Sequence, residues 1–106
     1  MKFKRSLGQN LLIDKNISRK ILSLTSLKNK KIIEIGAGTG NLSIEILRLI
    51  PKKLILIEKD KIFSNNLKSL FKNEKNLSII NGDILKLNLK KIISDDTIVI
   101  GNLPYN

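Results

Sequence analysis

Short apolar runs alternate along the chain with segments in which apolar residues return every three or four positions. The runs are rich in isoleucine and leucine and stop at glycine or at a polar side chain, which is typical of buried β-strands. They occupy residues 32–35, 54–57, 77–80 and 97–100. Helical spacing follows the first two runs, between Gly40 and Pro51 and again after Asp60, which is placed to cap a helix that reaches Phe71. The pattern therefore predicts strands and helices in alternation.

The remaining segments show weaker patterns. Residues 1–13 form a basic lead that closes with the apolar cluster Leu11–Ile13. Asp14 is the expected N-cap of a first helix over residues 15–25, where apolar positions again recur at helical spacing. Between the third and fourth apolar runs, residues 84–96 are expected to form a short helix or a loop.

Strands that alternate with helices form βαβ units, and such units build a parallel sheet. The predicted fold class is therefore α/β, with a Rossmann-like sheet and helices on both of its faces. We expect one partial domain over residues 1–106, with the lead and first helix over 1–30 and four strand-loop units over 31–106. Ligands of such sheets bind outside the carboxyl ends of the strands. One rim should thus be lined by the residues that follow the four strands: Gly36, Glu58, Asp83 and Asn102.

The amino-acid composition narrows the chemistry that this rim can perform. The chain has 106 residues, of which 42% are hydrophobic, and it contains neither cysteine nor histidine. These absences exclude a disulfide framework, a zinc site with cysteine ligands, a thiol nucleophile and a histidine base. No metal site is expected, and any reaction must use carboxylates, amides, backbone groups or an organic cofactor.

A formal net charge of +11 points to a polyanionic partner, and RNA is the leading candidate. The abundance of Lys, Ile and Asn is also what an AT-rich genome produces, so charge alone does not establish RNA binding. The basic start Met1–Arg5 is not followed by the apolar core of a signal peptide, and no apolar run has the length of a membrane span. We expect a cytoplasmic protein that does not enter membranes.

The segment Glu34–Gly40 follows a predicted strand and opens a helix. Its glycines Gly36, Gly38 and Gly40 let the backbone approach a ligand closely. A nicotinamide-binding fingerprint requires glycine at the sixth position of the motif, where this chain has Asn41. The spacing favours S-adenosylmethionine, although a tight turn without a ligand is the alternative interpretation.

Two carboxylates stand at the ends of the next two strands. Glu58 lies about twenty residues beyond the glycines, where a carboxylate can accept hydrogen bonds from both ribose hydroxyls of an adenosine group. Asp83 can accept a hydrogen bond from the exocyclic amine of the adenine. The simpler alternatives are a surface pairing of Glu58 with Lys59 or Lys61, and a turn-forming role for Asp83.

The fourth strand is followed by the sequence Asn102-Leu103-Pro104-Tyr105. An adenine amine is a poor nucleophile because its lone pair is delocalised into the ring. If the Asn102 side-chain oxygen and a backbone carbonyl near Leu103 or Pro104 accept its hydrogens, the lone pair turns towards an incoming methyl group. Pro104 would keep the turn rigid and Tyr105 would stack on the target base. A plain turn is the alternative.

Taken together, these motifs resemble those of the KsgA-type rRNA adenine dimethyltransferases. The segment Ser6–Leu12 is similar to the Gly-Gln-Asn-Phe-Leu lead of that family, with Leu11 in place of Phe. The later family motifs match in the same order and at similar spacing, with Ala37 in place of a usual Pro. They are Glu34–Gly40, Glu58, Gly82-Asp83 and Gly101–Asn106.

The resemblance implies a class I methyltransferase sheet, here cut short after the fourth strand because the family continues beyond Asn106. It implies transfer of two methyl groups from S-adenosylmethionine to each of two adjacent adenines near the 3′ end of small-subunit rRNA, by a monomer. The target adenine would be held by Asn102–Tyr105. The cofactor would be contacted by Asn10, Leu12, Gly36, Gly38, Glu58, Asp83 and Asn102.

Four alternatives remain open at this point. The macrolide-resistance methyltransferases of large-subunit rRNA share the core, but often carry Ser where this chain has Gly8. DNA adenine methyltransferases usually show Asn-Pro-Pro-Tyr or Asp-Pro-Pro-Tyr, and Leu103 argues against them. An inactive truncated fragment and a small nicotinamide-binding protein are the other two.

Overall fold

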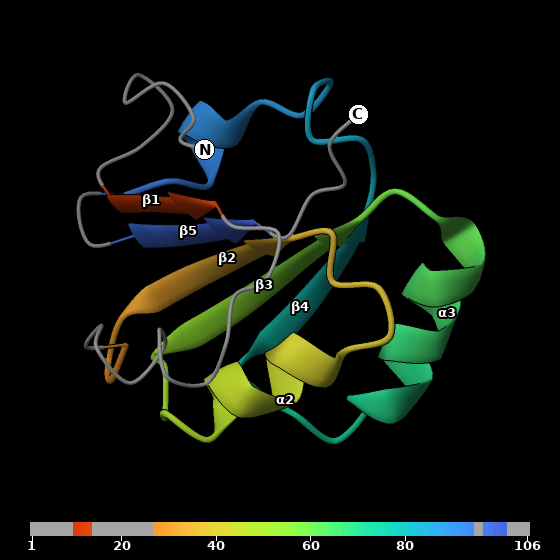
Figure 1. Ribbon diagram of the computed structural model, residues 1–106, viewed down its shortest axis with the longest axis horizontal. Coiled ribbons are helices and arrows are strands. Elements are labelled where there is room, and N and C mark those ends of the chain that lie inside the picture. The colour runs from red at the N-terminus through yellow and green to blue at the C-terminus, as the bar shows by residue number, and fades with distance from the viewer. Residues whose placement is uncertain (1–9, 14–26, 95–96, 102–106) are drawn as a thin grey trace.

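The computed structural model describes residues 10–13, 27–94 and 97–101. They form a parallel sheet of five strands with the order β1-β5-β2-β3-β4 (Figure 1). In chain order the elements are β1 (Asn10–Ile13), β2 (Lys31–Ile35), α2 (Asn41–Leu47), β3 (Lys53–Glu58), α3 (Lys61–Leu70), β4 (Leu77–Asn81), the 3₁₀ helix η2 (Leu89–Lys91) and β5 (Thr97–Gly101).

The strand order reverses beside β2. From β2 the chain moves outward to β3 and then β4, whereas β5 pairs on the other side of β2. The register keeps the strand ends level, since Ile35 pairs with Ile57 on one side and with Gly101 on the other. In doubly wound sheets this reversal point, at the carboxyl ends of the strands, is where ligands bind.

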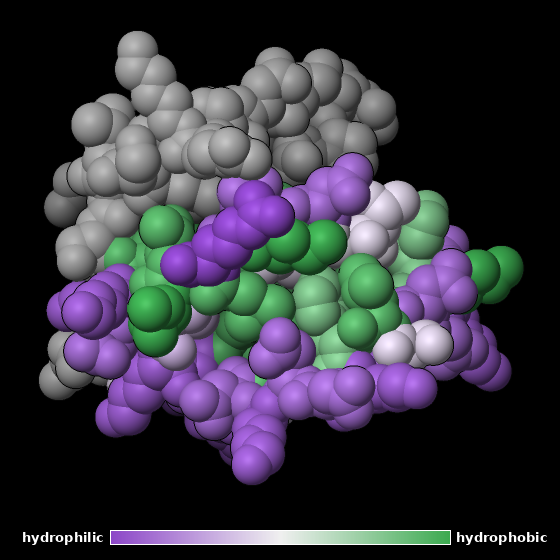
Figure 2. Space-filling view, turned by 90° about the horizontal axis from the view of Figure 1, so that it is seen from below, coloured by the Kyte–Doolittle hydropathy of each residue, from purple (hydrophilic) through white to green (hydrophobic). Residues whose placement is uncertain are grey.

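Both faces of the central strands β2, β3 and β5 are buried, which explains why these strands are rich in apolar residues. One set of alternating strand positions packs against Ile46 of α2 and Leu67 of α3. Leu27 and Phe71 belong to the same cluster. The other set, which includes Ile33, Ile55 and Val99, packs against the segment 84–93. Figure 2 looks at the molecule from the side of α2 and shows hydrophilic side chains around an apolar middle.

The predicted α/β class with a parallel sheet is confirmed, and so are the four predicted strands and the two helices after Gly40 and Asp60. Asp60 caps α3 as expected, because its Oδ1 accepts a hydrogen bond from the Phe63 N–H at 2.9 Å. Residues 84–94 form turns around η2, in agreement with the expected short helix or loop. The helix predicted over 15–25 lies outside the described residues.

One element was missed. The apolar cluster at the end of the basic lead is not merely part of a lead but the edge strand β1, so the sheet has five strands rather than four. β1 has four residues and pairs only with β5, from Asn10 beside Ile98 to Ile13 beside Gly101. A strand this short, whose partner lies more than eighty residues away in the sequence, has no local signal that distinguishes it from a loop.

Candidate functional site

A cleft of about 580 Å³ lies at the carboxyl ends of β2, β3 and β4. Its volume is within the range of small-molecule sites, which are largely apolar with a few fixed polar groups. This cleft has that character, because several isoleucines line it together with three carboxylates. Its lining residues are Ile35, Gly36, Ile57, Glu58, Lys59, Asp60, Gly82, Asp83, Ile84 and Leu85.

The glycine loop forms one side of this region. Gly36, Gly38 and Gly40 have φ angles of 75°, 59° and 88°, a left-handed conformation that a side chain would strain. Gly40 is also packed tightly, since a Cβ there would lie 3.1 Å from a Leu67 methyl group. The Gly36 N–H donates to the Ile57 carbonyl at 2.8 Å, so the loop leaves the sheet directly beside the end of β3.

Glu58 is the best-held side chain of the cleft. It is only 7% exposed, and both of its carboxylate oxygens accept backbone hydrogen bonds. Oε1 accepts from the Gly38 N–H at 2.7 Å and Oε2 from the Asp60 N–H at 2.8 Å. Each carboxylate oxygen can accept a second hydrogen bond, so this carboxylate is fixed in place while it keeps acceptor capacity. It is suited to binding a pair of neighbouring hydroxyl groups.

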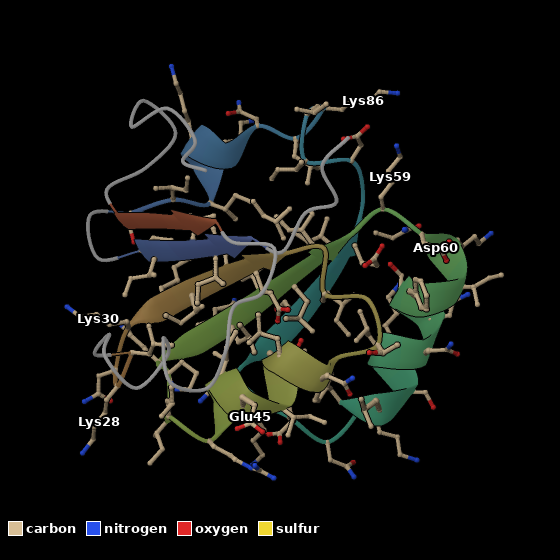
Figure 3. The ribbon with its side chains drawn as sticks, in the orientation of Figure 1. Lys28, Lys30, Glu45, Lys59, Asp60 and Lys86 are labelled. Atoms are coloured by element: carbon tan, nitrogen blue, oxygen red, sulfur yellow. The ribbon has the colours of Figure 1, made fainter. Side chains whose placement is uncertain are left out.

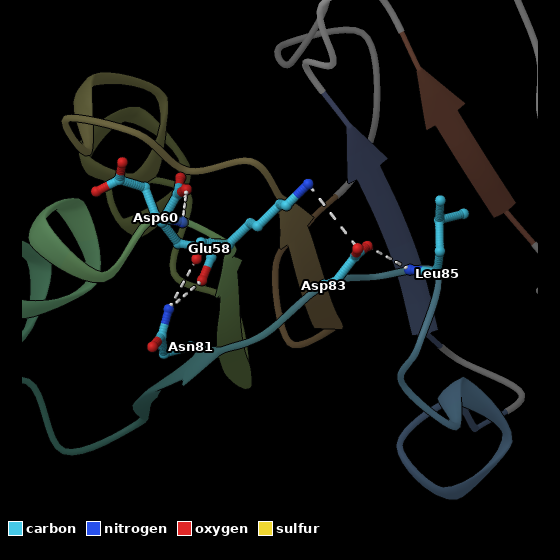
Figure 4. Close-up of polar contacts among 6 residues, drawn as sticks. Glu58, Asp60, Asn81, Asp83 and Leu85 are labelled. Atoms are coloured by element: carbon cyan, nitrogen blue, oxygen red, sulfur yellow. Dashed lines mark hydrogen bonds and ion pairs between the residues drawn. The ribbon is translucent and has the colours of Figure 1, made fainter.

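The backbone at the end of β3 is equally constrained. The Glu58 carbonyl accepts hydrogen bonds from the Ser64 hydroxyl at 3.1 Å and from the Asn81 side-chain amide at 3.0 Å. The same amide also donates to the Lys59 carbonyl at 3.1 Å, as the close-up in Figure 4 shows. Side chains of α3 and β4 thus hold the end of β3 in position from both sides.

Asp83 faces the cleft from the end of β4. Its Oδ1 accepts from the Leu85 N–H at 2.9 Å, which closes a local turn, and its Oδ2 lies 3.9 Å from the Lys59 Nζ (Figure 4). The Lys59 side chain is 80% exposed, so the ion pair is a weak one. The carboxylate therefore combines a backbone partner that sets its orientation with a cation that a ligand can displace.

The buried carboxyl group of Glu34 was missed as a functional candidate. It is 1% exposed and its Oε1 accepts from the Ser43 hydroxyl at 2.6 Å, which ties β2 to α2 behind the glycine loop. Burial raises the pKa of Glu34 to about 7; the Ser43 hydrogen bond acts in the opposite direction and the charge of Glu58 adds to the rise. The signal for it in the sequence is a glutamate inside the apolar run 32–35.

The structure brings together three of the predicted rim residues, Gly36, Glu58 and Asp83, while Gly38 joins them through its bond to Glu58. Asn10 and Leu12 lie in β1, which is separated from β2 by β5. The predicted catalytic residues Asn102, Leu103, Pro104 and Tyr105 lie outside the described residues; the chain reaches them from Gly101, which pairs with Ile35.

Sequence reasoning also missed several lining residues, chiefly Lys59, Asp60, Ile84 and Leu85. Their signal was their position directly after a strand end or a rim carboxylate. Among the described residues, no three side chains of the metal-ligating types come together. Within the same part of the chain, no helix has both the length and the apolar character needed to cross a membrane.

Comparison with known proteins identifies the family. The family model for ribosomal RNA adenine dimethylase matches residues 1–106. The chain is 48% identical over 106 residues to the ribosomal RNA small subunit methyltransferase A of Pelagibacter ubique, covering 100% of this chain and 40% of that protein. It is 41% identical over 107 residues to the protein of the same name from Neorickettsia sennetsu, covering 99% and 41%. The chain thus spans about two fifths of the length of these relatives.

Solved structures agree with this assignment. A dimethyladenosine transferase from Plasmodium falciparum superposes with a TM-score of 0.68 at 30% identity, over 91% of this chain and 34% of that one. The 23S rRNA methyltransferase ErmE gives the same TM-score at 20% identity, over 82% and 34%, and supports the fold alone. With a matching family model along its whole length, the chain belongs to the ribosomal RNA adenine dimethylase family.

Proposed function

We propose that this protein is an S-adenosylmethionine-dependent RNA methyltransferase that dimethylates two adjacent adenines of small-subunit rRNA. The observation that carries the proposal is the buried, backbone-held carboxylate of Glu58, set between the glycine loop and Asp83 in one cleft. The names of the curated relatives, which specify the small ribosomal subunit, favour this substrate over large-subunit rRNA. The implied location is the cytoplasm and the implied state a monomer.

The cleft fits the adenosine half of S-adenosylmethionine. Glu58 would accept hydrogen bonds from the two ribose hydroxyls, and Asp83 would accept one from the exocyclic amine of the adenine. Gly36 and Gly38 would allow close approach of the backbone, and the apolar side chain of Ile84 suits the face of an adenine ring. By family resemblance Asn10, Leu12 and Asn102 would complete this set. The cofactor supplies a methyl group activated by its bond to a sulfonium sulfur.

The segment Asn102–Tyr105 would act on the target base. The Asn102 side-chain oxygen and a backbone carbonyl near Leu103 or Pro104 would accept the two hydrogens of the adenine amine and turn its lone pair towards the methyl group. Tyr105 would stack on the base once it has left its own stack. The amine proton would leave to water after transfer, so the reaction needs no histidine or cysteine.

Two measurements test the proposal. Isothermal titration calorimetry of the chain with S-adenosylmethionine should show binding that NADH does not compete with. The protein should transfer methyl groups to small-subunit rRNA, with primer extension stopping at two adjacent adenines. Methylation of large-subunit rRNA instead would support the macrolide-resistance class. Absence of both binding and transfer would reject the proposal and favour an inactive fragment.

A further inference from the structure

The amino ends of the strands form an edge that the proposed methyl-transfer chemistry does not use. Strand beginnings and neighbouring turns place six lysines on this edge, which we call the amino-edge lysine patch. Its members are Lys28, Lys30, Lys31, Lys52, Lys53 and Lys75. In Figure 3, Lys28 and Lys30 lie at the end of the molecule opposite to Lys86 and to Lys59, which lines the cleft. We infer that this patch is a second RNA-binding surface that contacts phosphate groups.

Backbone hydrogen bonds join the parts of the patch into one surface. The Lys52 N–H donates to the Lys30 carbonyl at 2.8 Å, and the Asn29 N–H donates to the Ile50 carbonyl at 3.0 Å. On the other side of β3, the Leu54 N–H donates to the Asn76 carbonyl at 2.9 Å. Three chain segments far apart in the sequence therefore present their lysines side by side.

The charges of the patch are not balanced locally. Neither of the two ion pairs found among the described residues includes one of the six lysines. Glu74 is a described carboxylate on this edge, and Asp95 and Asp96 precede β5 in a part of the chain that is not described. Even if all three carboxylates are counted, six lysines leave a surplus of positive charge that attracts a polyanion.

The sheet itself brings like charges together. Lys31 at the start of β2 is the register partner of Lys53 at the start of β3. Like charges at paired positions of neighbouring strands repel each other, so this pairing favours a ligand that neutralises them. RNA phosphates are such a ligand, because they attract lysine by charge and release their counterions when a lysine neutralises them.

A hollow of about 380 Å³ lies beside the lysines, between the turn after α2 and the turn before β4. Asn73 and Asn76 contribute amide groups that can hydrogen-bond the ribose 2′-hydroxyls by which proteins recognise RNA. Ile50, 63% exposed at its rim, has a φ of 54°, a strained conformation for a β-branched residue. Strain of this kind persists where the surroundings impose it and often marks functional surfaces.

The patch is separated from the cleft by the length of a strand. The five residue steps from Lys53 to Glu58 correspond to about 17 Å. An RNA that contacts both edges would therefore be held at two points, one by its phosphates and one by its target adenine. The inference takes RNA as the partner from the proposed function and adds to it a contact surface that lies away from the reacting base.

A pair of charge-matched double variants tests the inference. Lys52→Gln/Lys53→Gln removes two charges from the patch, and Lys90→Gln/Lys91→Gln removes two exposed charges from η2. RNA affinity is measured by fluorescence anisotropy with a fragment from the 3′ end of small-subunit rRNA over a salt series. The patch variant should bind about tenfold more weakly near 0.1 M salt, and its salt slope should fall by roughly 1.4 to 1.8. The η2 variant should change affinity less than twofold.

Equal losses in the two double variants, or an unchanged salt slope in the patch variant, would overturn the inference. The inference would also be overturned if the patch variant lost binding to anionic phospholipid vesicles but still bound RNA. That result would indicate that the patch binds a membrane surface. Calorimetry with S-adenosylmethionine should give the same affinity for both variants and the wild type, which shows that the cleft is folded. If the patch binds RNA but the protein does not methylate it, the proposed function alone is rejected. If the protein methylates RNA but the two double variants bind RNA with equal affinity, this inference alone is rejected.

Discussion

The two edges of this small sheet hold their ionisable side chains in different ways. At the carboxyl edge, Glu34, Glu58 and Asp83 are buried or half-buried, and each accepts a hydrogen bond from a backbone N–H or a hydroxyl group. At the amino edge, the lysines of the patch are exposed or half-exposed and have no acidic partner among the described residues. In a parallel sheet all strands begin at one edge and end at the other, so the same geometry separates the two sets.

This difference predicts different responses to substitution. A buried carboxylate with fixed partners is preorganised for binding. Removing it leaves the protein groups that donate to it without an acceptor, and it also removes the hydrogen bonds that it would make to a ligand. An exposed lysine contributes a screened charge whose effect is small, roughly additive and dependent on salt. Single substitutions should therefore have large effects at the carboxyl edge and small effects at the amino edge.

The largest effect is expected for Asn102→Ala. If Asn102 orients the adenine amine, the variant should lose methylation activity by roughly a hundredfold to a thousandfold, as when one oriented hydrogen-bonding group is removed from an active site. Its affinity for S-adenosylmethionine should stay within about tenfold, or 1.4 kcal/mol. Single-turnover methylation and calorimetry measure the two quantities. Asn66→Ala, on the exposed surface of α3, is the control and should change neither. A parallel loss of cofactor affinity would make Asn102 a binding residue only.

Much of the carboxyl edge could be predicted from the sequence, because it depends on local patterns. The apolar runs define buried strands, and the polar residue after each run must lie where the strands end. This reasoning placed Gly36, Glu58 and Asp83 together, and the structure confirms their arrangement in one cleft. What it could not supply were partners set by tertiary contacts. Ser43 reaches Glu34 only because the glycine loop reverses the chain between them.

Two other features lacked a sequence signal for the same reason. β1 is recognisable only through its pairing with β5, since its four residues have no strand pattern of their own. The segment that covers the second face of the sheet packs Ile84, Leu87, Ile92 and Ile93, all partly buried, against it at irregular spacing. Neither a period of two nor one of 3.6 describes that spacing, so sequence reasoning could offer only a short helix or a loop.

The second largest effect concerns the pH dependence of stability. The pKa of Glu34 is raised from 4.5 to about 7 by burial, so the folded state favours the protonated carboxyl group. Below pH 4.5 this group is protonated in both states and has no cost. As the pH rises from 4.5 to 7, the unfolded state loses its proton more readily, and the free energy of unfolding should fall by at most about 3 kcal/mol.

Glu34→Gln is the matching variant, because its amide oxygen can still accept the Ser43 hydrogen bond while nothing titrates. Urea unfolding at pH 5 and pH 8 should show a smaller drop in stability for the variant than for the wild type. If the free energy of unfolding fell equally in the variant and the wild type, Glu34 would be ionised in the folded protein at both pH values. The burial of Glu34 would then not distinguish the carboxyl edge from the amino edge.

The third effect is on folding of the glycine loop. Gly40→Ala introduces a Cβ at a φ of 88° and within 3.1 to 3.3 Å of Leu67, Leu70 and Phe71. The backbone strain and the crowding together should lower the free energy of unfolding by about 2 kcal/mol. Gly82→Ala is the control at the same edge, since its Cβ would meet only the flexible side chain of Leu87, at 3.3 Å. Thermal unfolding should show the larger loss for Gly40→Ala; equal losses would contradict the role assigned to its φ angle.

The smallest effect is expected at the amino edge, and it is best measured against a substitution of the same residue type at the carboxyl edge. Glu58→Ala removes the proposed acceptor of the ribose hydroxyls and should weaken S-adenosylmethionine binding by about 1.5 kcal/mol, roughly tenfold. Glu74→Gln removes an exposed carboxylate from the rim of the hollow beside the lysine patch. It should leave cofactor affinity unchanged and strengthen RNA binding about twofold, since one repulsive charge is lost. If Glu74→Gln weakened cofactor binding as much as Glu58→Ala does, the two edges would not be functionally separate.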